Sequence, residues 1–121
     1  MAKYKFLNVN PDKQKEFDCV TRAISFCSGL PYNIVRKKLF HTSRLLDCDK
    51  LCVCCYKFFI EKVLNCKPIK CYGMTVNEFA DLHPLGTYLV RMDGHISSVK
   101  NNCVYDIFDC RDLELTDAWK I

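Results

Sequence analysis

Residues 86–108 read GTYLVRMDGHISSVKNNCVYDIF, and apolar and polar side chains alternate along most of this stretch. A period of two predicts strands over residues 87–92, 95–100 and 104–108. Asn101 and Asn102 lie between the last two strands, and because asparagine tolerates a positive φ, the pair favours a two-residue hairpin turn. The C-terminal part of the chain is therefore expected to form an antiparallel β-sheet.

The sequence before Gly86 has helical periodicity instead. Helices are predicted over residues 18–28, 32–40 and 50–64, and residues 6–15 read as a loop. Thr75 followed by Glu78 has the form of a capping box, which predicts a fourth, short helix. The apolar residues expected on the inner sides of the first two helices are Val20, Ala23, Ile24, Cys27, Ile34, Val35, Leu39 and Phe40. The expected fold class is α+β, with N-terminal helices packed on a C-terminal antiparallel sheet.

Length and composition indicate one domain over residues 1–121, because half of the 121 residues are hydrophobic. No apolar stretch is long enough to span a bilayer and the N-terminus lacks the apolar core of a signal peptide, so a cytoplasmic location is expected. Thiols stay reduced there, and the ten cysteines read as free thiols, metal ligands or a nucleophile. The net charge of +4 is scattered, and residues 36–38 read as a solvated helix face, so no nucleic-acid or membrane partner is expected.

Cys19 is the cysteine whose position most favours chemistry. Asp18 is a good N-cap residue, which places Cys19 in the first turn of the first predicted helix. The partial positive charge of a helix N-terminus lowers the pKa of a thiol and favours the nucleophilic thiolate. His95, at the start of a predicted strand, is the candidate base.

Four segments resemble a known family: DCVTRAI at 18–24, HPLGTY at 83–88, GH at 94–95 and YDIFD at 105–109. Together they resemble a family of small bacterial and phage proteins with the papain-like cysteine peptidase fold, distantly similar to the bacteriocin-processing peptidases. The resemblance runs from about Asn8 to Ile121 and is weakest over residues 41–72. It implies a papain-like fold and a thiol hydrolase that cleaves an amide or isopeptide bond in a peptide or protein substrate. A cysteine peptidase is the first expectation, and amidases, deamidases and acyltransferases use the same Cys-His pair. No cofactor is expected.

The resemblance implies a role for each of three side chains. Cys19 attacks a carbonyl carbon as thiolate and forms a thioester, His95 transfers the proton to the leaving group, and a carboxylate orients the imidazole. The acid is implied to follow the histidine strand, which leaves Asp106 and Asp109. The predicted two-residue turn places Asp106 on the same side of the sheet as His95, whereas a three-residue loop would place Asp109 there. The turn chemistry favours Asp106.

An oxyanion formed at the carbonyl needs hydrogen-bond donors. The backbone N–H of Cys19 at the helix start can supply one, and papain-like enzymes usually add a side-chain amide from shortly upstream. Gln14 is the expected donor, with Asn10 as the alternative.

Several candidate residues also have structural interpretations. Asp18 and Arg22, one helical turn apart, are expected to form a surface ion pair, although Arg22 could instead brace the loop before Cys19 or a substrate edge. His83, between Leu82 and Pro84, is expected to cap or pack a loop rather than to act as the base. For the whole chain, the alternative function is a catalytically inactive papain-like protein that binds a host or phage partner.

The remaining cysteines raise the question of a zinc site. Cys48, Cys52, Cys54 and Cys55 lie close together in the sequence, and the site could be completed by His41 or by Cys66 and Cys71. Three of the clustered cysteines fall on the predicted helix 50–64 and would project in different directions, unlike the paired ligands that zinc modules present from turns. No metal site is therefore expected, and buried or incidental thiols are the favoured interpretation.

Overall fold

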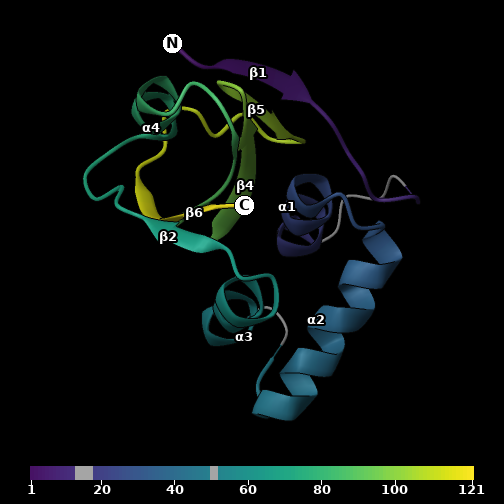
Figure 1. Cartoon of the computed structure of the whole chain (residues 1–121). Coiled ribbons are helices and arrows are strands. Elements are labelled where there is room, and N and C mark those ends of the chain that lie inside the picture. Colours follow the sequence, from purple (N-terminus) through teal and green to yellow (C-terminus); the bar gives the residue numbers. More distant parts are fainter. Residues whose placement is uncertain (13–17, 50–51) are drawn as a thin grey trace.

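The computed structural model describes residues 1–12, 18–49 and 52–121, and these form an α+β fold with helices on both faces of a six-stranded sheet (Figure 1). The helices are α1 (Cys19–Ser28), α2 (Tyr32–Leu46), α3 (Val53–Phe58) and α4 (Val76–Leu82), and a π-helical turn, η1 (Phe59–Val63), continues α3. The strands are β1 (Lys3–Phe6), β2 (Lys67–Ile69), β3 (Thr87–Met92), β4 (His95–Lys100), β5 (Cys103–Asp106) and β6 (Leu115–Lys120). No helix among the described residues has the length and apolar character needed to cross a membrane.

The sheet has the strand order β1-β5-β4-β3-β6-β2 and is mixed. Strand β1 pairs with β5 in parallel, whereas the other neighbours pair antiparallel. The prediction of a purely antiparallel, C-terminal sheet was therefore wrong, because the N-terminal segment supplies one edge and β2 the other. These edge strands have four and three residues, too few to show a reliable period of two.

The predicted hairpins are confirmed, and their register matters for the site. Strands β3 and β4 span the predicted residues, while β5 ends at Asp106 rather than at residue 108. Lys100 pairs with Cys103, and the two residues between them, Asn101 and Asn102, have φ values of 49° and 62°. Two successive positive φ values belong to the type I′ turn, whose twist matches that of the strands it joins.

Helix α1 follows its prediction closely. Its predicted apolar stripe is buried, and Gly29 ends the helix in the left-handed conformation with φ 76°. The helix lies beside β4 (Figure 1). Burial of the stripe therefore holds Cys19, the first residue of α1, against the sheet.

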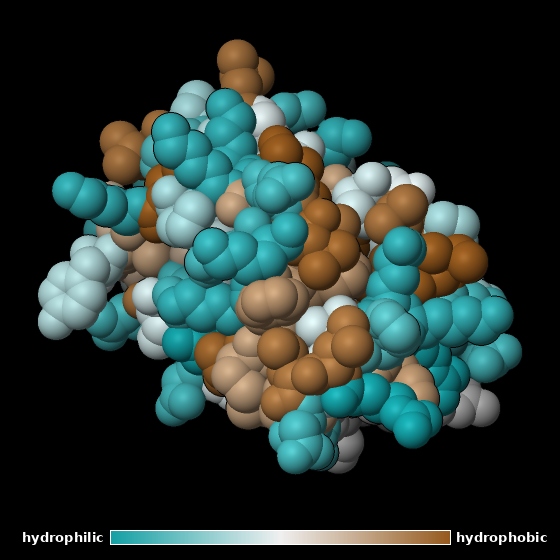
Figure 2. All heavy atoms as spheres, turned by 60° about the horizontal axis from the view of Figure 1, so that its bottom comes forward, coloured by the Kyte–Doolittle hydropathy of each residue, from teal (hydrophilic) through white to brown (hydrophobic). Residues whose placement is uncertain are grey.

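Helix α2 runs six residues further than predicted, and its inner face was predicted only in part. Val35 and Leu39 are buried, but Ile34 and Phe40 are 40% and 52% exposed. At 100° per residue, the buried face continues through Thr42 and Ser43. Ile34 and Phe40 therefore lie on the flanks of this face. Figure 2 looks onto the end of the molecule where α2 and α3 lie, and apolar side chains are interspersed there with hydrophilic ones.

The third predicted helix begins later than expected, and the fourth is confirmed. Helix α3 starts at Val53 instead of residue 50, so Cys52 precedes it. Helix α4 has both bonds of its capping box: Thr75 Oγ1 accepts from the Glu78 backbone N–H at 3.2 Å, and Glu78 Oε1 accepts from the Thr75 N–H at 3.0 Å.

The sheet has a hydrophobic core on each face. Alternate residues of the strands point to opposite faces, so Leu89 and Ile96 pack with α1, α2 and α3, whereas Val90 and Val99 pack with α4. Both cores contain fully buried aromatic residues, Phe59 in the first and Phe79 in the second. The rigid layers place the start of α1 next to the start of β4.

Candidate active site

His95 and Asp106 meet across β4 and β5, with 2.6 Å between His95 Nε2 and Asp106 Oδ2. The pairing of Ser98 with Tyr105 sets this contact. One step further along the strands, Ser97 lies opposite Asp106, and His95 is then the diagonal neighbour of Asp106 on the same side of the sheet. The register of the two-residue turn thus brings Asp106 next to the histidine, as predicted from the strand geometry.

Two further donors hold the Asp106 carboxylate. The Ser97 hydroxyl donates to Oδ2 at 2.6 Å, and the backbone N–H of Ile107 donates to Oδ1 at 2.7 Å. Asp106 and Ser97 are 6% and 1% exposed, so water competes little for these bonds. The carboxylate is therefore fixed in position before any substrate arrives.

Asp109, the other candidate acid, lies at the surface. Its two carboxylate oxygens accept from the Arg111 guanidinium at 2.9 and 2.8 Å, and its side chain is 43% exposed. The structure thus brings Asp106, not Asp109, to His95.

Cys19 is the first residue of α1, and its thiol is hydrogen-bonded to the His95 ring and to the backbone of Ile96. Burial raises the pKa of the Cys19 thiol, but these two hydrogen bonds outweigh it, so that the pKa lies below the ordinary value of 9.0. The position at a helix N-terminus acts in the same direction. Cys19, His95 and Asp106 form a continuous hydrogen-bonded series.

The environment of His95 favours the imidazolium. Burial lowers the pKa of His95, but hydrogen bonds to Asp106, Cys110 and Cys19 raise it to about 11. Burial raises the pKa of Asp106, and its hydrogen bonds to His95 and Ser97 bring it below the ordinary 3.8. The two directions agree: each group stabilises the charged form of the other, and the same imidazolium can balance a Cys19 thiolate.

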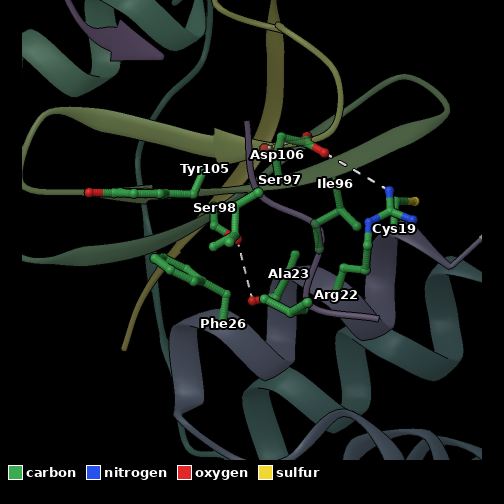
Figure 3. A pocket seen from close by; sticks show the side chains of 11 residues that line it. Cys19, Arg22, Ala23, Phe26, Ile96, Ser97, Ser98, Tyr105 and Asp106 are labelled. Atoms are coloured by element: carbon green, nitrogen blue, oxygen red, sulfur yellow. Dashed lines mark hydrogen bonds and ion pairs between the residues drawn. The ribbon is translucent and has the colours of Figure 1, made fainter. Parts of the chain in front are cut away.

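Arg22 lies between two buried carboxylates. It forms an ion pair with Asp18 one helical turn earlier, and its Nη2 is 3.9 Å from Asp106 Oδ1 (Figure 3). The side chains of Arg22 and Asp18 are each 8% exposed. The predicted ion pair is confirmed, but its predicted surface position was wrong. The pair is buried, because α1 turns this side toward the sheet, and it connects the start of the helix to β5.

Asp18 also anchors the N-terminal segment. Its Oδ2 accepts from the Asn10 amide at 3.0 Å and from the Tyr32 hydroxyl at 2.7 Å. Its side chain makes no capping bond to α1, although it occupies the N-cap position. Asn10 Nδ2 is engaged by these two side chains and is buried, which argues against the alternative that Asn10 is the oxyanion donor. Gln14 lies outside the described residues.

A small cavity of about 10 Å³ lies beside Cys19, lined by α1 on one side and by β4 and β5 on the other (Figure 3). This volume suffices for about one water molecule. Any larger molecule must therefore approach the thiol from outside the cavity. Cys19 is half-buried, which leaves part of its surface open to such an approach.

The other histidine and cysteine candidates lie away from this series. The His83 ring packs on Phe79 with 4.5 Å between centroids, so the prediction that it packs is confirmed. Cys27 is buried in the core on the α1 face, where burial raises its pKa to about 12. Cys52 Sγ and Cys54 Sγ are 2.8 Å apart, so the prediction that the clustered thiols project in different directions was wrong for this pair, whereas Cys55 is buried while Cys54 is exposed. The pair meets because Cys52 precedes α3.

Two neighbours of His95 were not predicted. The Phe108 ring meets the imidazole edge to face with 5.5 Å between centroids, and the fully buried Cys110 is hydrogen-bonded to the same ring. Both follow β5 in an irregular segment, where the sequence shows neither a helical period nor a period of two. No pattern in the sequence therefore indicates that they fold back onto the histidine.

Comparison of the chain with protein-family models, with curated proteins and with solved structures finds no match.

Proposed function

We propose that this chain is a thiol hydrolase of papain-like fold that cleaves an amide or isopeptide bond. The observation that supports the proposal is the hydrogen-bonded series of Cys19, His95 and Asp106, in which a thiol at a helix start meets a histidine held by a buried carboxylate. Nucleophilic catalysis needs a nucleophile, a base within hydrogen-bond reach and a third group that orients the base. The elements that supply them are α1, β4 and β5.

The reaction follows from these contacts. The Cys19 thiolate attacks the carbonyl carbon and forms the C–S bond, and the proton held by His95 passes to the leaving nitrogen as the C–N bond breaks. Water then attacks the thioester, His95 takes its proton, and the thiol is released with the acid product. Since His95 Nε2 is bound to Asp106, Nδ1 is the ring nitrogen that exchanges the proton with Cys19.

The oxyanion of the tetrahedral intermediate needs donors that are already in place. The backbone N–H of Cys19, the first residue of α1, belongs to the helix-terminal groups that no intrahelical carbonyl can satisfy. It is therefore the donor that we assign to the negative charge that develops on the substrate oxygen.

The test is the reactivity of Cys19 toward iodoacetamide in native protein from pH 4 to 9, located by peptide mass spectrometry. Cys19 is expected to react at lower pH than Cys54, whose thiol is exposed and has its pKa raised to about 11 by hydrogen bonds to neighbouring cysteines. The His95→Ala variant is expected to lose this advantage. His83→Ala is the matched control, because that ring packs on α4 and β3.

Two outcomes would overturn the proposal. In one, Cys19 reacts no faster than Cys54 below neutral pH. In the other, His95→Ala leaves the reactivity of Cys19 unchanged. If the activated thiol is found, a mixture of unmodified peptides incubated with wild type and with Cys19→Ala identifies the bond, and cleavage by the Cys19→Ala protein would point to a different nucleophile.

A further inference from the structure

A second thiol lies against His95 and Asp106. Cys110 Sγ, a carboxylate oxygen of Asp106 and a ring nitrogen of His95 all lie within 4.8 Å of one another, the one such group of three metal-ligating atoms in the parts of the chain that the structure describes. Cys110 is 0% exposed, and the side chains of Asp106 and His95 are 5% and 15% exposed. The proposed hydrolysis makes no use of Cys110.

We propose that these three side chains form a binding site for a thiophilic divalent cation, with Zn²⁺ as the best fit. A thiolate, an imidazole and a carboxylate are the ligands that zinc prefers, and three protein ligands with an open fourth position are a common tetrahedral arrangement. One thiolate and one carboxylate also balance the charge of the ion. Mg²⁺ and Ca²⁺, which require oxygen ligands, do not fit this set.

The ion takes the place of the proton between His95 and Asp106. Their 2.6 Å contact has to open to about 3.4 Å, the separation of two ligands on a tetrahedral zinc, which is a movement of less than about 1 Å. The Cys110 thiol proton and the Nε2 proton leave to solvent as the metal bonds form. Ser97 stays hydrogen-bonded to the carboxylate and holds it as a ligand.

The consequence for Cys19 rests on the proposed hydrolase. With the metal on Nε2, the remaining imidazole proton resides on Nδ1, the nitrogen that has to accept the proton of Cys19. The histidine then cannot act as a base. Zinc at this site therefore lowers the reactivity of Cys19 without coordinating its sulfur, and removal of the metal restores that reactivity.

Binding is measured directly in a protein that cannot hydrolyse and lacks the clustered thiols: Cys19→Ala combined with Cys48→Ser, Cys52→Ser and Cys54→Ser. Zn²⁺ is titrated against a chromophoric chelator. One equivalent is expected, and Cys110→Ser is expected to weaken it at least tenfold. Cys66→Ser is the matched control, since that thiol is also buried but lies in the core on the α1 face.

Three results would overturn the metal site. They are the absence of a zinc equivalent in the Cys19→Ala background, an unchanged affinity in Cys110→Ser, and a loss of the same size in Cys66→Ser. If Cys110→Ser does not fold, the X-ray absorption of the one-equivalent zinc complex decides without that variant: one sulfur ligand supports the site, and several sulfurs contradict it. Because these readouts involve no hydrolysis, they succeed or fail independently of the proposed function.

The regulatory effect has its own measurement. The alkylation of Cys19 is compared in protein that retains Cys19, with and without the Cys110→Ser substitution. Zn²⁺ is expected to slow the alkylation at least tenfold more when Cys110 is present than when it is replaced. Equal slowing in both would mean that zinc bridges Cys19 and His95 directly, which overturns the role of Cys110.

Discussion

Arg22 on α1 and Asp106 on β5 face each other inside the protein, with 3.9 Å between Nη2 and Oδ1. Because Arg22 also pairs with Asp18, the helix that carries Cys19 is joined by charge to the strand that carries the partner of His95. The site is therefore held together by a buried ionic network as well as by the two cores.

Arg22→Ala is expected to lower the free energy of unfolding by about 3–5 kcal/mol, because it leaves the buried Asp18 carboxylate without its cation and removes a second cation from the neighbourhood of Asp106. Urea denaturation measures this. The matched control is Arg36→Ala on the basic outer side of α2, an exposed position that should change stability by less than about 0.5 kcal/mol. Equal stability of the two variants would show that the network contributes nothing.

Asp106→Asn is expected to reduce the hydrolysis rate by about 10²–10⁴-fold and also to slow the alkylation of Cys19 at neutral pH. The amide removes the charge that stabilises the imidazolium, and it occupies nearly the same volume. Asp109→Asn is the control, since Asp109 pairs with Arg111 at the surface. If only Asp109→Asn lost reactivity, Asp109 would be the acid that orients His95, which would contradict the role of Asp106.

Ser97→Ala removes one of the donors to the Asp106 carboxylate, and a lost buried hydrogen bond to a charged group costs about 1–3 kcal/mol. Ser98→Ala is a close match in size, burial and strand, but the Ser98 hydroxyl donates at 3.4 Å to the uncharged Ala23 carbonyl instead of to a carboxylate. We expect the first variant to unfold at lower urea concentration and to react more slowly at Cys19. The reverse order would mean that Ser97 does not support the carboxylate.

The sequence predicts this site more fully than it predicts the sheet. The resemblance left Asp106 and Asp109 as candidates, and the Asn101–Asn102 turn was enough to choose Asp106 as the residue beside His95, because the parity of a hairpin follows from its turn length. Strand β1 was beyond such reasoning. Its pairing with β5 is parallel and joins segments about 100 residues apart, which no local period reveals.

The burial of Arg22 and the position of Cys110 were also beyond the sequence. A charged residue one turn from an acid is a common surface pattern, and only the packing of α1 on β4 shows that this pair is inside. Cys110 reaches His95 through an irregular segment after β5. In both cases the contact depends on how separate elements pack together. The predicted contact between His95 and Asp106 depends instead on the alternation and turn length of one hairpin.

The pH dependence of the site is the last prediction, measured in the presence of a chelator. The alkylation rate of Cys19 reports the acid limit, and kcat/KM, once a substrate is found, reports both limits. The thiolate is lost as the pH falls through the pKa of Cys19, which lies below 9.0. The proton donor is lost as the pH rises through the pKa of His95, which is raised from 6.5 to about 11. Hydrolysis should therefore be high over a broad range between these limits. In Asp106→Asn, the alkaline limit is expected to move to lower pH, because the carboxylate that raises the pKa of His95 is gone. An alkaline limit unchanged from wild type would contradict the pairing of His95 with Asp106.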